Sequence, residues 1–99
     1  MREFDEKSIT AAVLARMDNC QDPRFRQVMT SLITHLHDFV REVKLTEAEW
    51  IGAIQFLTSV GKTCTDKRQE FILLSDTIGV SILVITLNHP AAASLDDAG

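Results

Sequence analysis

The chain has 99 residues, of which 45% are hydrophobic and 24% charged. This length suits one domain, and the apolar content excludes a fully disordered polymer. With 14 acidic against 10 basic residues and no basic block, the composition disfavours a nucleic-acid-binding protein. The longest uncharged stretch, from Thr77 to His89, is shorter than the roughly 20 apolar residues that span a bilayer. Acidic residues near the N-terminus disfavour a secretory signal, so we expect a cytoplasmic domain.

The first expected helix runs from Ser8 to Met17 and ends in a break at residues 18–22. Its apolar residues recur at helical spacing, which predicts one inward face. The residues predicted to face inward are Ile9, Val13, Leu14 and Met17.

The clearest periodic signal lies between Asp22 and Lys44. Asp22 is a good helix cap, and Pro23 fits the first helical position, where no amide hydrogen is needed. Apolar residues then recur at intervals of three and four, as in an amphipathic helix. A subset also keeps a heptad rhythm, which favours antiparallel bundle packing or helix pairing between subunits. This subset is Phe25, Met29, Leu32, Leu36, Phe39 and Val43.

Two further helices are expected after residue 45. Thr46 and Glu49 have the spacing of a capping box, and Gly61 is a typical C-terminal stop for the helix that they open. Asp66 is the predicted cap of the next helix, which carries the apolar run 71–74. The first of these two helices is expected to bury Trp50, Ala53, Ile54, Leu57 and Val60.

The segment from Gly79 to Leu87 has high strand propensity, but the sequence offers no second strand to pair with it. We therefore predict a helix, capped by Asp76 and ended before Pro90. Its side chains are apolar on every side, and a small bundle cannot surround a helix completely. This helix therefore needs a partner chain, a second domain or an apolar ligand.

No group of residues predicts catalysis. His35 and His37 are two positions apart, so they leave a helix about 200° apart and cannot bind one ion together. Cys20 and Cys64 are too distant in sequence for a zinc motif and are expected to be free thiols. Carboxylates such as Glu70 are expected to pair with arginines. The enzymatic alternative is an unconventional metal site built from His35, His37, His89 and a cysteine.

Several blocks resemble one known family. The blocks are Met29–Val43, Thr46–Trp50, Ala53–Leu57 and, as the most specific, Asp66–Thr77. Together they are similar to the N-terminal domain of intradiol ring-cleaving dioxygenases, in the hydroxyquinol and chlorocatechol 1,2-dioxygenase branch. The resemblance covers about residues 19–89.

The resemblance implies that the parent enzymes insert both atoms of O2 between the hydroxylated carbons of a catechol or hydroxyquinol. It also implies that two tyrosines and two histidines of a C-terminal β-sandwich domain hold a non-haem ferric ion. The present chain has no tyrosine, and its histidines match positions of the helical domain. We therefore expect no catalytic residue, metal ligand or cofactor in these 99 residues, and no β-sandwich domain.

For the helical domain, the resemblance implies pairing across a two-fold axis and a hydrophobic tunnel that holds a phospholipid-like molecule. We thus predict an all-α fold, a small bundle of about five helices over residues 1–90, with residues 91–99 as a tail or the start of a linker. Its function would be non-catalytic, as a homodimerisation and linker domain. The alternative is a free-standing helical module that pairs with a full-length dioxygenase. The residues predicted at the lipid or dimer interface are Phe25, Met29, Leu32, Leu36, Ile82 and Ile85.

Overall fold

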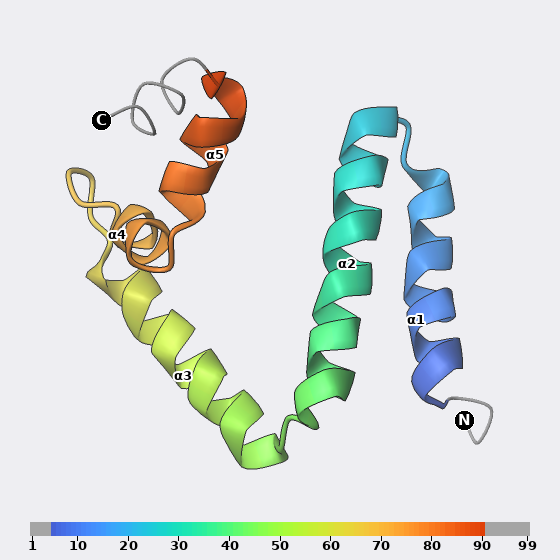
Figure 1. Cartoon of the computed structure of the whole chain (residues 1–99). Helices are drawn as coiled ribbons and strands as arrows, with labels where there is room; N and C mark the ends of the chain where they lie inside the picture. Colours follow the sequence, from blue (N-terminus) through green and yellow to red (C-terminus); the bar gives the residue numbers. More distant parts are fainter. Residues whose placement is uncertain (1–4, 91–99) are drawn as a thin grey trace. The chain divides into compact units, whose positions relative to one another are not determined.

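The computed structural model describes residues 5–90, and it confirms the all-α prediction (Figure 1). The predicted tail at 91–99 lies outside the described residues. The chain divides into two compact units, with the division between Trp50 and Ile51, and each unit is described by itself. The helices are α1 (Glu6–Ala15), the short 3₁₀ helix η1 (Arg16–Asn19), α2 (Pro23–Val43), α3 (Glu47–Thr63), α4 (Glu70–Thr77) and α5 (Val80–Asn88).

In the first unit, α1 starts two residues earlier than predicted, because Asp5 caps it. The Asp5 Oδ1 atom accepts hydrogen bonds from the amides of Lys7 (3.0 Å) and Ser8 (2.8 Å). The Ser8 hydroxyl accepts in return from the Asp5 amide at 2.8 Å. This reciprocal pair satisfies amides that the first turn of a helix leaves without partners.

The Asp5 cap makes the start of α1 sensitive to acid. Hydrogen bonds from Ser8, and then from Lys7, lower the pKa of Asp5 below its ordinary value. A lowered pKa adds stability above the unfolded-state pKa of about 4, and that stability is lost as the pH falls through the folded-state pKa. We expect the Lys7 and Ser8 amide resonances to shift toward random-coil positions as the pH falls below about 4. In Asp5→Ala the Lys7 and Ser8 amide resonances should lie near their random-coil positions already at pH 7. An acid transition in that variant equal to that of the unchanged chain would contradict the role of Asp5 as the cap.

Helix α2 begins and ends as predicted. Asp22 Oδ1 accepts from the amides of Arg24 (3.0 Å) and Phe25 (3.1 Å), and Pro23 occupies the first position. The helix ends at Lys44, which adopts a left-handed conformation with φ of 51°. Helix α1 lies alongside α2 (Figure 1).

Helix α3 confirms the capping box but not its predicted end. The Thr46 amide donates to Glu49 Oε1 at 2.9 Å, and the Glu49 amide donates to Thr46 Oγ1 at 3.1 Å. The helix continues through Gly61 to Thr63, so the predicted stop at Gly61 is wrong. A glycine ends a helix only where the backbone turns left-handed, and Gly61 does not.

The burial predicted for α3 is confirmed only at Val60, which is 7% exposed. Trp50, Ile54 and Leu57 have exposed side chains, and Ala53 is exposed as well. Helical spacing identifies an apolar face, but burial requires a second layer that covers it.

In the second unit, α4 is capped by Gln69 rather than by Asp66. Gln69 Oε1 accepts from the Phe71 amide at 3.2 Å. Asp66 lies in the preceding turn, where the Thr65 amide donates to the Arg68 carbonyl at 2.8 Å. Because this turn occupies residues 65–68, the helix starts later than the sequence suggests.

The helix predicted over residues 79–87 is confirmed as α5. Asp76 does not cap it, because Asp76 lies inside α4. Gly79 stands at the start of α5 with φ of 81°. The axes of α4 and α5 are bent by 79°, and the hydroxyls of Ser75 and Ser81 lie 2.7 Å apart across the bend.

Gly79→Ala is expected to destabilise the chain by roughly 1–2 kcal/mol, because an L-residue is strained in the left-handed region. A Cβ atom at this position would meet no atom within 4 Å, so the cost comes from the backbone and not from a clash. Gly52→Ala is the matched control, since Gly52 lies inside α3 with open space around it. The control should gain about 0.5–1 kcal/mol. Urea unfolding followed by circular dichroism measures both; a stabilised Gly79→Ala would contradict the argument.

Candidate interaction surfaces

Exposed apolar surface is the main feature of the described residues. Among residues 5–90, Val60 is the only buried hydrophobic side chain. Contiguous exposed apolar patches on a domain indicate surfaces that contact something else. Two such surfaces lie on α2 and on the α4–α5 pair.

Helix α2 has two different long faces. One faces α1 and carries half-buried residues such as Ile33, His37 and Arg41. The other carries the heptad positions, of which all but Met29 are 48–53% exposed and Met29 is half-buried. Since α1 occupies a different face, it does not cover these positions. We call them the α2 seam: Phe25, Met29, Leu32, Leu36, Phe39 and Val43.

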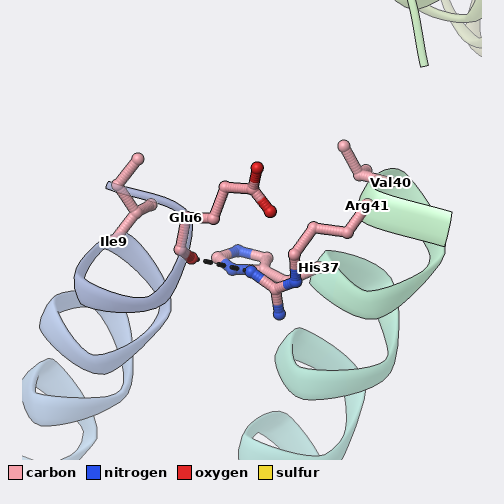
Figure 2. Close-up of a pocket in the computed structure, with 5 residues that line it drawn as sticks. All are labelled: Glu6, Ile9, His37, Val40 and Arg41. Atoms are coloured by element: carbon pink, nitrogen blue, oxygen red, sulfur yellow. Dashed lines mark hydrogen bonds between the residues drawn. The ribbon is translucent and has the colours of Figure 1, made fainter. Parts of the chain in front are cut away.

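A polar cluster joins α1 to α2 (Figure 2). Thr10 Oγ1 lies 2.7 Å from His37 Nδ1 and accepts a hydrogen bond from Arg41 Nη1 at 3.0 Å. Arg41 Nη1 also donates to the main-chain oxygen of Glu6 at 2.7 Å, and Arg41 Nη2 pairs with Asp38 at 2.9 Å. The contacts of Thr10 and of the Glu6 main chain with His37 and Arg41 thus join the two helices, while Asp38 pairs with Arg41 inside α2.

A shallow pocket of about 300 Å³ lies beside this cluster. The pocket surface is mostly apolar. The apolar atoms of Ile9 and Val40 are exposed there, although Ile9 was predicted to face inward. The lining residues are Glu6, Ile9, His37, Val40 and Arg41.

Thr10→Val is expected to destabilise the first unit by roughly 1–2 kcal/mol. Valine keeps the shape of threonine but removes the hydroxyl that contacts both His37 and Arg41, leaving part-buried polar atoms without a partner. The control is Thr58→Val, at an exposed position of α3, which should change stability by less than about 0.5 kcal/mol. Amide exchange of α1 residues measures the effect. Equal exchange rates in the two variants would show that the cluster does not hold α1.

In the second unit, a pocket of about 180 Å³ contains Val60 and the α4 residues Leu73 and Leu74. Glu70 also lines it and pairs with Arg68 Nε at 2.8 Å, which confirms the predicted pairing. The large apolar side chains of α5 are 46–70% exposed. They point in several directions around the helix, as the sequence predicts: Val80, Ile82, Leu83, Val84, Ile85 and Leu87.

The predicted interface residues fall into two groups. Phe25, Met29, Leu32 and Leu36 lie together on the α2 seam of the first unit. Ile82 and Ile85 are exposed on α5 of the second unit, and their place in one common surface with the seam stays a prediction.

The seam also includes Phe39 and Val43, which the predicted interface set omits. Phe39 and Val43 continue the alternating four- and three-residue spacing of the seam, and this spacing is the sequence signal that would have placed them in the predicted interface.

The histidines of α2 are used separately. His37 turns toward Thr10, whereas His35 Nδ1 donates to the Ser31 carbonyl at 2.8 Å within its own helix. Cys20 and Cys64 are free thiols. Over residues 5–90, no three His, Cys, Asp or Glu side chains come together as a metal-binding group.

Hydropathy adds one further observation. Within residues 5–90, no single helix is both long and apolar enough to cross a bilayer. Helices α4 and α5 reach that length and composition only when taken together, across their 79° bend.

Comparison with known proteins gives a consistent match. The family described as "Catechol dioxygenase N terminus" matches residues 22–95. The chain is 54% identical to 6-chlorohydroxyquinol 1,2-dioxygenase of Cupriavidus pinatubonensis, over 90% of this chain and 32% of that protein. It is 50% identical to hydroxyquinol 1,2-dioxygenase of Corynebacterium glutamicum, over 94% of this chain and 31% of that protein. It thus spans about a third of the length of the curated relatives it matches.

A solved structure agrees with the sequence matches. Hydroxyquinol 1,2-dioxygenase from Pseudomonas putida DLL-E4 superposes with a TM-score of 0.82 and 54% identity, over 85% of this chain and 30% of that one. The resemblance noted in the sequence is therefore confirmed. The chain belongs to the family of catechol dioxygenase N-terminal domains, on the hydroxyquinol 1,2-dioxygenase side of the intradiol dioxygenases.

Proposed function

We propose that this chain is the non-catalytic dimerisation and linker domain of an intradiol dioxygenase that acts on hydroxyquinol- or catechol-type rings in aromatic-compound catabolism. The observation that carries the proposal is the exposed α2 seam in a chain whose relatives are dioxygenases about three times as long. The ring-cleavage chemistry and its ferric ion are assigned to the part of such an enzyme that these 99 residues do not include. A cytoplasmic location belongs to the same proposal.

The α2 seam supports the dimerisation role. A long stripe of large apolar side chains at heptad spacing is typical of a helix that packs against another helix. Burying one such side chain completely contributes roughly 1.5–3 kcal/mol relative to leaving it exposed. The seam residues are about half exposed, so a second helix on this face would gain a substantial part of that energy at each position.

The α5 surface supports binding of an amphiphile. Its side chains are apolar on all sides and exposed, and a phospholipid acyl chain is an apolar ligand of matching chemistry. We propose that Ile82 and Ile85 contact such a molecule.

The test combines sedimentation equilibrium of the 99-residue chain with solvent extraction and mass spectrometry of bound lipid. A concentration-dependent dimer carrying a stoichiometric phospholipid is the expected result. A monomer at high concentration with no extractable amphiphile would overturn the proposal. Oxygen uptake with hydroxyquinol provides the enzymatic control, and activity of the isolated chain would contradict a non-catalytic role.

A further inference from the structure

We propose that the contact of Arg41, Thr10 and His37 is a pH-sensitive latch, in which neutral His37 accepts a hydrogen bond that holds α1 against α2 and protonation of its imidazole releases α1. Thr10 lies in α1 and the other two residues lie in α2, so both hydrogen bonds of Thr10 join the two helices. The inference concerns the first unit by itself and does not depend on the function proposed above.

The direction of the latch follows from what each group can donate. A guanidinium has no acceptor, so Arg41 Nη1 donates to Thr10 Oγ1 across their 3.0 Å contact. The Thr10 hydroxyl has one hydrogen, and within residues 5–90 its other partner is His37 Nδ1 at 2.7 Å. Donation of that hydrogen to Nδ1 satisfies all three groups. A ring that accepts at Nδ1 is neutral and carries its hydrogen on Nε2.

The opposite direction leaves a hydrogen unused. A hydrogen on His37 Nδ1 would give Thr10 Oγ1 two donors, and the hydroxyl hydrogen would then have no acceptor among the contacts of the described residues. These contacts are part-buried, and a polar group without a partner costs more free energy there than on the surface. The neutral ring with no hydrogen on Nδ1 is therefore the form that fits the site.

Protonation of His37 changes the latch in two ways. It places a hydrogen on Nδ1, so the bond from the Thr10 hydroxyl is lost. It also adds a positive charge beside Arg41: both nitrogens contact Thr10 Oγ1 and so lie within about 6 Å of each other, a range in which like charges repel. Water can accept from both cations, whereas Thr10 Oγ1 does so only by leaving its own hydrogen unpaired. Lower pH therefore shifts the equilibrium toward release of α1.

The neighbouring charges offset this effect only in part. Asp38 is already paired with Arg41 at 2.9 Å, and Asp5 accepts from amides at the start of α1. Glu6 lines the pocket beside His37, and its side chain extends over the space between α1 and α2 (Figure 2). Glu6 is exposed, so water weakens its attraction for an imidazolium. The titratable and charged residues of the elements around His37 are Asp5, Glu6 and Lys7 at α1, Arg16 and Asp18 in η1, and His35, Asp38, Arg41 and Glu42 in the second half of α2.

Nitrogen NMR of the imidazoles tests the direction of the latch. In the full chain labelled with isotopic nitrogen at histidine, the shifts distinguish a ring nitrogen that carries hydrogen from one that does not. His37 is expected to carry its hydrogen on Nε2 at about pH 7.5. His35 is the internal contrast, because its Nδ1 donates to the Ser31 carbonyl at 2.8 Å. Thr10→Val should move the Nδ1 shift of His37 and leave that of His35 in place. A hydrogen on Nδ1 of neutral His37 would overturn the inference.

Amide exchange tests the release of α1. Protection factors, which compare each amide with an unfolded chain at the same pH, are measured across the range in which imidazoles titrate, from about pH 7.5 to about pH 5. Protection of the α1 amides should fall roughly three- to tenfold over this range, as expected for the loss of one hydrogen bond. This range lies above the one in which Asp5 is protonated.

Two matched variants assign the pH dependence to one ring. His37→Asn places a carbonyl oxygen near the position of Nδ1 but cannot gain a proton, so its α1 protection should stay constant within about twofold. His35→Asn removes the histidine that bonds within its own helix and should keep the full decrease. Constant protection in the unchanged chain, or a full decrease in His37→Asn, would overturn the latch. If His37→Asn does not fold, the unchanged chain still decides, because His37 protonation and the loss of α1 protection must share one midpoint.

Discussion

Leu36→Glu is expected to disrupt the proposed dimer, raising its dissociation constant by at least about 100-fold. Leu36 lies at the middle of the α2 seam and is exposed in the single chain, so the substitution adds no buried charge to the monomer. In the proposed dimer, each copy would place a carboxylate in the apolar interface. An unpaired buried charge costs roughly 3–5 kcal/mol, more than the 2.8 kcal/mol or so that corresponds to a 100-fold change.

Ser31→Glu is the matched control, because Ser31 is exposed on the same helix but off the seam. Sedimentation equilibrium over a wide range of concentrations measures both variants, and circular dichroism checks that helix content is unchanged. The seam is not the dimer interface if Leu36→Glu associates as tightly as the control.

Val60→Asp is expected to unfold the second unit. Val60 is buried, and it lines a pocket with residues of α3 and α4, including Phe56 and Leu73. Burying an unpaired carboxylate there costs roughly 3–5 kcal/mol. A unit of about 50 residues has a total stability of roughly 3–7 kcal/mol, so this one change removes most of it.

Amide exchange resolved by residue measures the effect of Val60→Asp. Protection should be lost in α4 and α5, while the amides of α1 and α2 provide an internal reference. Thr58→Asp introduces the same charge at an exposed position of α3 and should leave protection in place. Retained protection of α5 in Val60→Asp would show that this residue is not what holds the second unit together.

Local features of the fold could be predicted from the sequence. The caps at Asp22 and at Thr46 with Glu49 depend on bonds within three residues, and the structure confirms both. The cap assigned to Asp66 failed because a turn at residues 65–68 separates it from α4, and Gln69 takes its place. Sequence spacing ranks candidate caps but does not reveal such a turn.

Contacts between distant residues could not be predicted. His37 contacts Thr10, which is 27 residues away, and no pattern in the sequence links the two. The overestimate of burial at Trp50 and Leu57 has a related cause. An apolar face indicates that something covers it, but only three-dimensional packing says whether the cover belongs to the same unit.

Because α1 lies away from the α2 seam, contacts between two copies and contacts between α1 and α2 can be lost independently. The Thr10, His37 and Arg41 contacts lie within one polypeptide, so their strength is independent of concentration. The association proposed for the α2 seam would follow mass action. Dilution should therefore separate two copies of the proposed dimer while each retains its α1–α2 hairpin, whereas acid strong enough to protonate Asp5 should loosen the beginning of that hairpin at any concentration.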